Sequence, residues 1–178
     1  THSPSNETFF QNIYCLEPSN FMLLSNKITS KKEFNYESSI YATKNLKELF
    51  YESVASVMDK KSGSMLSGGL DSSAISAVLQ DLSSEKIHSF SVVFPELSLE
   101  LKARADESEY SAAVVKKSGM HMNRVPITKF NFIKNIKENT VFFEEPFMAT
   151  NIYIYEEAFE AMRKKGVDII LDGTDGDS

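Results

Sequence analysis

The spacing of apolar residues in the first third of the chain predicts two kinds of structure. Apolar runs at 9–14 and 21–24, separated by the turn signal at 17–20 (EPSN), predict short strands and turns over residues 1 to about 35. From Tyr36 the period becomes helical, and one long helix is expected to reach about Asp59. Its apolar positions are Leu46, Leu49, Phe50, Val54, Val57 and Met58. We expect residues 60–63 (KKSG) to end it, because cations and a glycine favour a helix C-terminus.

From residue 65 onward, strand-length apolar segments alternate with segments of helical spacing. Residues 95–105 are expected to form a mobile loop, with Asp106 and Glu109 as a capping pair for the helix that follows. The alternation predicts an α/β fold with a doubly wound parallel sheet covered by helices on both faces. The expected strands are 65–66, 87–94, 123–127 and 167–171, and the expected helices end near Leu82, Gly119, Phe143 and Lys165.

Composition and charge restrict the classes of function. A net charge of −6 argues against a nucleic-acid partner, because a phosphate backbone requires clustered Lys and Arg. No apolar run approaches the ~18 residues of a membrane span, and no signal peptide is visible. The single cysteine, Cys15, excludes an internal disulfide, favours a cytoplasmic location and is expected to be buried. The three histidines lack the spacing of metal ligands.

The segment Leu66-Ser67-Gly68-Gly69-Leu70-Asp71-Ser72-Ser73 has the composition of an anion site. It joins an apolar strand to a helix through two glycines, which let the backbone turn sharply and approach a ligand. The serines and the first N–H groups of the helix would point at one spot, where the positive end of the helix dipole favours phosphate. The carboxylate of Asp71 could share a Mg2+ ion with those phosphates. A simple strand–turn–helix junction with Ser or Asp as N-cap is the alternative.

Position by position, this segment resembles the SGGxDS pyrophosphate loop of the N-type ATP pyrophosphatases, also called the PP-loop superfamily. It differs from a Walker loop, because no Gly-Lys-Ser/Thr follows the glycines. Within that superfamily, the sequence LSGGLDSSAI is most similar to the synthetase domain of glutamine-dependent asparagine synthetases. The resemblance implies an adenine-nucleotide α-hydrolase-like fold. It divides the chain into a glutaminase-type remnant or linker at 1–35 and the N-terminal part of a synthetase domain at 36–178.

The last seven residues, 172–178 (DGTDGDS), occupy the place of the family's S-G-E-G-x-D-E loop. Gly173 and Asp177 match that pattern, whereas Thr174 and Ser178 stand where the family carries glutamate. In the family the first glutamate is thought to help proton transfer when ammonia attacks, and Asp175 is the nearest replacement. A calcium-binding loop fails on the spacing of its acidic residues. A solvated turn remains an alternative, because Asp and Gly are common in turns.

The resemblance implies ATP-dependent formation of an amide by adenylation of a carboxylate. Its cofactors would be ATP and Mg2+, and a glutaminase domain outside this chain would supply ammonia. Aspartate and ammonia would give asparagine, AMP and pyrophosphate. A related lactam-forming synthetase and a non-catalytic nucleotide-binding module are the alternatives. The chain is expected to be part of a longer enzyme, because it lacks an initiator Met and stops on a glycine-rich loop. A homo-oligomer is left open as a partner.

The family match also assigns roles to individual residues. The pyrophosphate would be held by residues of the first loop, namely Ser67, Gly68, Gly69, Asp71 and Ser72. The metal would be held by Asp71 and Asp177, and the catalytic residues would be Asp71 and Asp175. The adenosine would be bordered by Leu66, Val92 and Gly173, with Asp172 among the nucleotide-binding residues.

Overall fold

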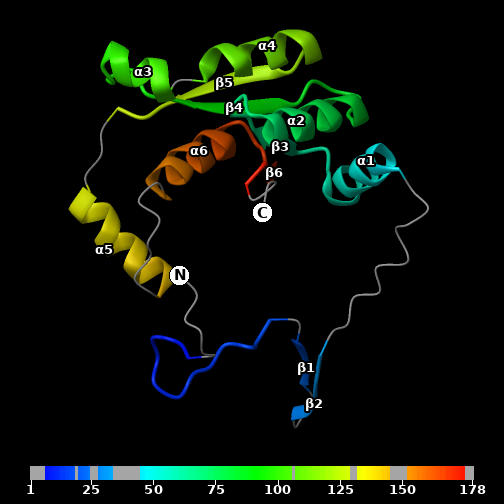
Figure 1. Ribbon diagram of the computed structural model, residues 1–178, viewed down its shortest axis with the longest axis vertical. Coiled ribbons are helices and arrows are strands. Elements are labelled where there is room, and N and C mark those ends of the chain that lie inside the picture. Colours follow the sequence, from blue (N-terminus) through cyan, green and yellow to red (C-terminus); the bar gives the residue numbers. More distant parts are fainter. Residues whose placement is uncertain are drawn as a thin grey trace. The chain divides into compact units, whose positions relative to one another are not determined.

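The computed structural model describes residues 7–18, 20–24, 28–33, 45–105, 107–128, 132–144 and 152–174 (Figure 1). The chain forms two compact units, one of Thr1–Lys44 with Phe132–Ala149 and one of Asn45–Asn131 with Thr150–Ser178. The expected domain boundary near residue 35 lies outside the described residues. The assignment of 1–35 to a glutaminase-type remnant therefore stays a prediction.

The described residues of the first unit include two paired strands and a helix. Strands β1 (Asn20–Leu24) and β2 (Ile28–Glu33) pair antiparallel, and α5 spans Phe132–Phe143. The strand expected at 21–24 and the helix expected to end near Phe143 are confirmed. The strand expected at 9–14 is wrong. That segment turns back on itself, with a bridge between Glu7 and Tyr14 and a hydrogen bond of 2.7 Å from Thr8 Oγ1 to the Ile13 carbonyl. Cys15 is exposed, contrary to expectation.

The second unit contains a four-stranded parallel sheet with the order β5-β4-β3-β6. Its strands are β3 (Ser62–Met65), β4 (His88–Val93), β5 (His121–Pro126) and β6 (Ile169–Leu171). The chain steps from β3 outward to β5 and then returns to the other side of β3 for β6. The strand order therefore reverses between β3 and β6, and ligands of open α/β sheets bind at such a point, beyond the carboxyl ends of the strands.

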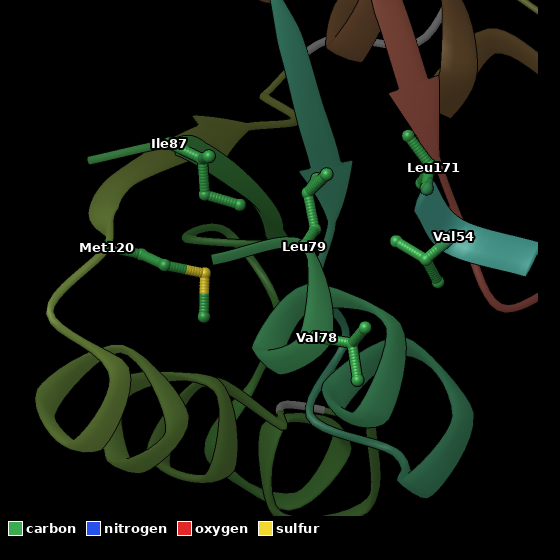
Figure 2. Close-up of a cluster of buried hydrophobic side chains, with 6 residues drawn as sticks. All are labelled: Val54, Val78, Leu79, Ile87, Met120 and Leu171. Atoms are coloured by element: carbon green, nitrogen blue, oxygen red, sulfur yellow. The ribbon is translucent and has the colours of Figure 1, made fainter. Parts of the chain in front are cut away.

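Helices cover both faces of this sheet, and each face has its own apolar core. Helices α1 (Leu46–Val57), α2 (Leu70–Leu82) and α4 (Ser108–Ser118) belong to the first face. Helix α6 (Ile152–Lys164) covers the second face, where Ala158 and Met162 pack with Phe90. The predicted α/β fold with a doubly wound parallel sheet is thus confirmed. The core of the first face, shown in Figure 2, consists of Val54, Val78, Leu79, Ile87, Met120 and Leu171.

Small polar residues set the distance between the sheet and the helices of the first face. Ser64 on β3 and Ser76 on α2 are both fully buried, and their hydroxyls form a hydrogen bond of 2.8 Å. Ser91 on β4 bonds Ser111 on α4 in the same way, at 3.2 Å. Because a serine side chain is short, the helix axes lie close to the strands while the buried hydroxyls remain satisfied. This close packing fixes the start of α2 above the end of β3.

The boundary between α1 and β3 differs from the expectation. Helix α1 begins after Asn45, whose side chain accepts a hydrogen bond of 2.9 Å from the Glu48 amide, and it ends at Val57. The residues expected to end the helix play other roles. Lys60 and Lys61 form a turn after it, and Gly63 lies inside β3. A Cβ on Gly63 would lie 2.8 Å from the His88 carbonyl oxygen, so this glycine serves close packing in the sheet.

Two expectations between β4 and α4 also need correction. The loop expected at 95–105 contains a helix, α3 (Leu99–Ala105). The N-cap of α4 is Glu107, and its side chain forms no capping hydrogen bond. Asp106, the expected cap, lies outside the described residues. No helix in the described ranges is long and apolar enough to cross a membrane.

Candidate functional site

The loop between β3 and α2 turns at Gly68. Its φ of +106° is a conformation that residues with a side chain rarely adopt. A Cβ on Gly68 would also lie 2.8 Å from Tyr110 Cβ and 2.9 Å from the Ser111 amide nitrogen. Gly68 is therefore required by both the turn and the packing of α4. Gly69 differs, because its backbone is ordinary (φ −65°) and an added Cβ would meet only Ser67 Oγ, at 3.4 Å.

Two serine hydroxyls hold this loop in shape. Ser72 is buried, and its Oγ lies 3.0 Å from Ser67 Oγ and 3.3 Å from the Gly69 carbonyl oxygen, to which it donates. The Ser67 amide donates to Ser72 Oγ at 3.3 Å, and the Gly69 amide donates to Ser67 Oγ at 3.2 Å. Ser72 therefore acts first as an internal support of the loop. Ser67 is exposed, so its hydroxyl can reach a ligand.

The N-terminus of α2 is available to an anion. Gly69 is its N-cap, and no side chain caps the helix. The first hydrogen bond of the helix runs from the Ser73 amide to the Gly69 carbonyl, which leaves the amides of the first turn without intrahelical acceptors. Asp71 lies in this first turn and is half-buried. The arrangement combines free amides, the positive end of the helix dipole and a carboxylate.

The loop after β6 lies directly against the start of α2. A Cβ added to Gly173 would lie 2.6 Å from the Ser72 amide nitrogen and 3.0 Å from Asp71 Cβ, so only a glycine fits at this position. The loop turns through Asp172, whose Oδ1 accepts a hydrogen bond of 3.3 Å from the Thr174 amide. The two loops that the sequence singled out are therefore neighbours in space.

A cavity of about 390 Å³ opens where these loops meet. It lies at the carboxyl ends of β3, β4 and β6, where the strand order predicted a ligand site. The predicted residues that line it are Leu66, Ser67, Gly69, Asp71, Ser72, Val92, Asp172 and Gly173. Gly68 does not line the cavity and instead shapes the turn behind it. Asp175 and Asp177 lie outside the described residues, so their predicted roles stay predictions.

Several lining residues were not expected from the sequence. Phe90 on β4 and Phe94 just beyond it line the cavity with Val92 at every second position, so the alternation of side chains along a strand could have indicated them. Glu107 comes from the start of α4, and Ile154 and Tyr155 come from the first turn of α6. The sequence carries no motif for these last three residues. Their position follows from how the two helices pack.

Carboxylates but no basic side chains line the described part of the cavity. Asp71, Glu107 and Asp172 are present, and no Lys or Arg is among the lining residues. A polyanion placed at the start of α2 would be repelled by these carboxylates unless a cation were bound with it. Carboxylates are hard oxygen ligands of the kind Mg2+ prefers. The described residues contain no ready-made cluster of three metal ligands, so the phosphates would have to complete the coordination shell.

Comparison with known proteins supplies independent information. A family model described as asparagine synthase matches residues 45–178. A curated protein of Methanocaldococcus jannaschii, whose name provisionally designates it a glutamine-hydrolysing asparagine synthetase, is 28% identical over 186 residues. That match covers 98% of this chain and 35% of the relative, so the chain spans about a third of the relative's length.

Proposed function

This chain belongs to the asparagine synthase family, as its two loops predicted, and from that premise we propose that its cavity binds ATP with Mg2+. The observation that carries the proposal is the uncapped N-terminus of α2 facing a cavity whose other side is apolar. Phosphates suit the amides and the dipole, and a purine base suits the apolar side. A ligand with a polyanionic end and a flat apolar end matches both.

Magnesium is part of the proposal because of the charge in the cavity. Asp71 is the described residue best placed to hold it, because it lies in the first turn of α2 beside the free amides. Asp177 is proposed as the second ligand. When bound, the ion neutralises the phosphates and the pyrophosphate leaving group. The amides of the first turn and the hydroxyl of Ser67 orient the phosphates on the protein side.

For the whole protein, we propose amide formation by adenylation. A carboxylate oxygen attacks the α-phosphorus of ATP and releases pyrophosphate. The nitrogen of ammonia or an amine then attacks the acyl carbon, AMP leaves and the nitrogen loses a proton. Aspartate with ammonia from a glutaminase domain is the first substrate pair to test, because the relative's name indicates glutamine hydrolysis. Asp175 is the proposed proton acceptor, because Thr174 is a poor one at neutral pH.

A second candidate function is favoured by one residue. Thr174 lines the cavity, at the position where the S-G-E-G-x-D-E loop of the asparagine synthetases carries glutamate. A change there favours a related amide- or lactam-forming synthetase that uses another nucleophile. A nucleotide-binding module without catalysis would show neither pyrophosphate exchange nor AMP release. Both reactions should therefore be assayed on the protein that contains this chain, with a panel of carboxylates that includes aspartate.

The binding proposal is tested on this chain by titration calorimetry with ATP, in the presence and absence of Mg2+. We expect saturable binding that requires the ion. Asp71→Asn keeps the size of the side chain but removes its charge, and it should weaken the Mg2+-dependent binding about tenfold or more, since hydrogen bonds and ion contacts of charged groups are worth about 1.5–3 kcal/mol. Asp59→Asn, at an exposed position between α1 and β3 that lines neither cavity, is the matched control. Equal binding in wild type and Asp71→Asn would contradict the proposed site.

A further inference from the structure

The cavity has two chemically different sides. The polar side consists of the β3–α2 loop, the β6 loop and Glu107, whereas the apolar side consists of residues from β3, β4 and α6. Within the apolar side, Tyr155 carries the one side-chain hydroxyl or amide among the described lining residues. Its neighbours there are aliphatic, thioether or phenyl groups, such as Met65, Val92 and Phe94. A nucleoside entering this side therefore meets a single polar side-chain group.

The packing of α6 places Tyr155 at the cavity. Ala158 and Met162, three and seven residues further on, are buried against the second face of the sheet. Residues at these spacings share one face of a helix, so the face that packs on the sheet also carries Tyr155. Because α6 begins at Ile152, Tyr155 lies in its first turn and beside the strand ends. Core packing thus fixes the direction of this side chain.

The Tyr155 hydroxyl is available to a ligand. The ring is half-buried, and its centroid lies 6.1 Å from that of Phe159, one turn along the helix. Within the described part of the chain, no hydrogen bond is formed by the hydroxyl. Buried tyrosine hydroxyls usually find a partner, so a half-buried one facing an apolar wall is suited to pairing with a bound molecule.

We propose that Tyr155 is a nucleoside-contacting residue that determines selectivity in this site, with its ring against the base and its hydroxyl bonded to the nucleoside. This inference rests on the proposed function, because it takes the phosphates to lie at the start of α2. It adds a residue from α6, which neither loop motif contains. Tyr155 should accordingly affect the binding of ATP and leave the binding of a phosphate chain without a nucleoside unchanged.

The test compares Mg·ATP with Mg·tripolyphosphate by calorimetry. Tyr155→Phe removes only the hydroxyl and should weaken ATP binding about threefold to tenfold, the range of one hydrogen bond. Tyr155→Leu removes the ring as well and should weaken it further. Tripolyphosphate binding should stay within about twofold in both variants. Tyr14→Phe is the control, because this tyrosine is exposed and does not line the cavity.

Each result decides a different claim. Unchanged ATP binding in both Tyr155 variants would overturn the role of Tyr155 while leaving the proposed function intact. An equal loss of ATP and tripolyphosphate binding would show that Tyr155 supports the fold of the site, which also overturns the inference. A wild-type chain that binds neither ligand would contradict the proposed function itself. Titration with 2′-deoxy-ATP and GTP then shows whether the hydroxyl contacts the ribose or the base.

Discussion

Gly173 lies so close to Ser72 that a Cβ at residue 173 would stand 2.6 Å from the Ser72 amide nitrogen. This contact joins the loop after β6 to the first turn of α2 through backbone atoms. A side chain at residue 173 would therefore have to push backbone atoms apart, which cannot rotate away as a side chain can. The site is therefore assembled by the fold of the sheet and does not depend on the β3–α2 loop alone.

Gly173→Ala should separate the two loops. The added methyl group must displace the start of α2 or the β6 loop, at an expected cost of about 1–3 kcal/mol in the free energy of unfolding. ATP binding should weaken more than stability alone explains, because the amides of the first turn shift. Urea unfolding and calorimetry on the same samples measure both effects. A variant with wild-type stability and affinity would show that the loops are not in contact.

The two glycines of the first loop should differ in how much a substitution destabilises the chain. Gly68→Ala is expected to destabilise the chain by about 1–3 kcal/mol, because φ is positive and Tyr110 leaves no room for a methyl group. Gly69→Ala should cost less, about 0.5–1 kcal/mol, because its backbone is ordinary and its Cβ position is open, and alanine is only a poorer N-cap than glycine. Gly69→Val should also fold but obstruct phosphate binding by bulk. Equal destabilisation by the two alanine variants would contradict this assignment.

His88 should make stability depend on pH. Burial lowers the pKa of His88 below its usual 6.5, and the neighbouring His121 and Lys165 lower it further. Its ring centroid lies 5.3 Å from that of His121 on β5, and Asn123 Nδ2 lies 3.1 Å from His88 Nδ1. Below about pH 6.5 the unfolded chain takes up a proton that the folded chain resists. The contribution of His88 to the free energy of unfolding should thus be fully present above this pH and be lost as the pH falls towards 5.

His88→Gln removes the titrating group while keeping a polar side chain. Its free energy of unfolding should change less between pH 7.5 and 5.5 than that of wild type, as measured by urea unfolding at both values. Replacing Lys61, which pairs with Asp168 at 2.7 Å on the surface, is the control for general charge effects. The same decline in His88→Gln and wild type would show that another group is responsible.

The sheet-containing unit should fold without the first residues of the chain. This unit begins at Asn45, and both of its apolar cores consist of residues between 50 and 171. A chain shortened to 45–178 should therefore unfold cooperatively in urea. Removing Thr1–Lys44 also separates α5 from the rest of its compact unit, so some added exposure of apolar surface is expected. Failure of the shortened chain to fold would show that the two units depend on each other.

The sequence predicted those parts of the site that lie next to each other along the chain. Ser67, Asp71 and Ser72 belong to one continuous motif, and parallel strands bring Asp172 to the same edge. Tyr155 could not be predicted in this way, because its direction depends on which residues of α6 pack on the sheet. Strand β3 was partly hidden because it reads SGSM, where close helix packing requires small polar residues in place of apolar ones.

Helix α3 escaped prediction for a different reason. It is seven residues long, and Leu99 and Leu101 are exposed, so no apolar stripe marks one face. The end of α1 was misplaced because a basic pair followed by a glycine is a common helix ending. Here Gly63 instead serves the contact with His88 and Val167 inside the sheet. A local signal is ambiguous where a tertiary contact requires the same residue type.

The location of ATP on this chain can be measured by NMR titration of the 15N-labelled protein with Mg·ATP. The account predicts saturable, Mg2+-dependent shifts of the amides of Gly69, Leu70, Asp71 and Gly173. A second cavity of about 700 Å³, between α1, α2 and α4, provides an internal comparison through the amides of Val114 and Lys117. The amide signals of Val114 and Lys117 should not follow the same ATP titration curve as those of Gly69, Leu70, Asp71 and Gly173. Shifts confined to Val114 and Lys117, or no saturable shift at the start of α2, would contradict the central claim.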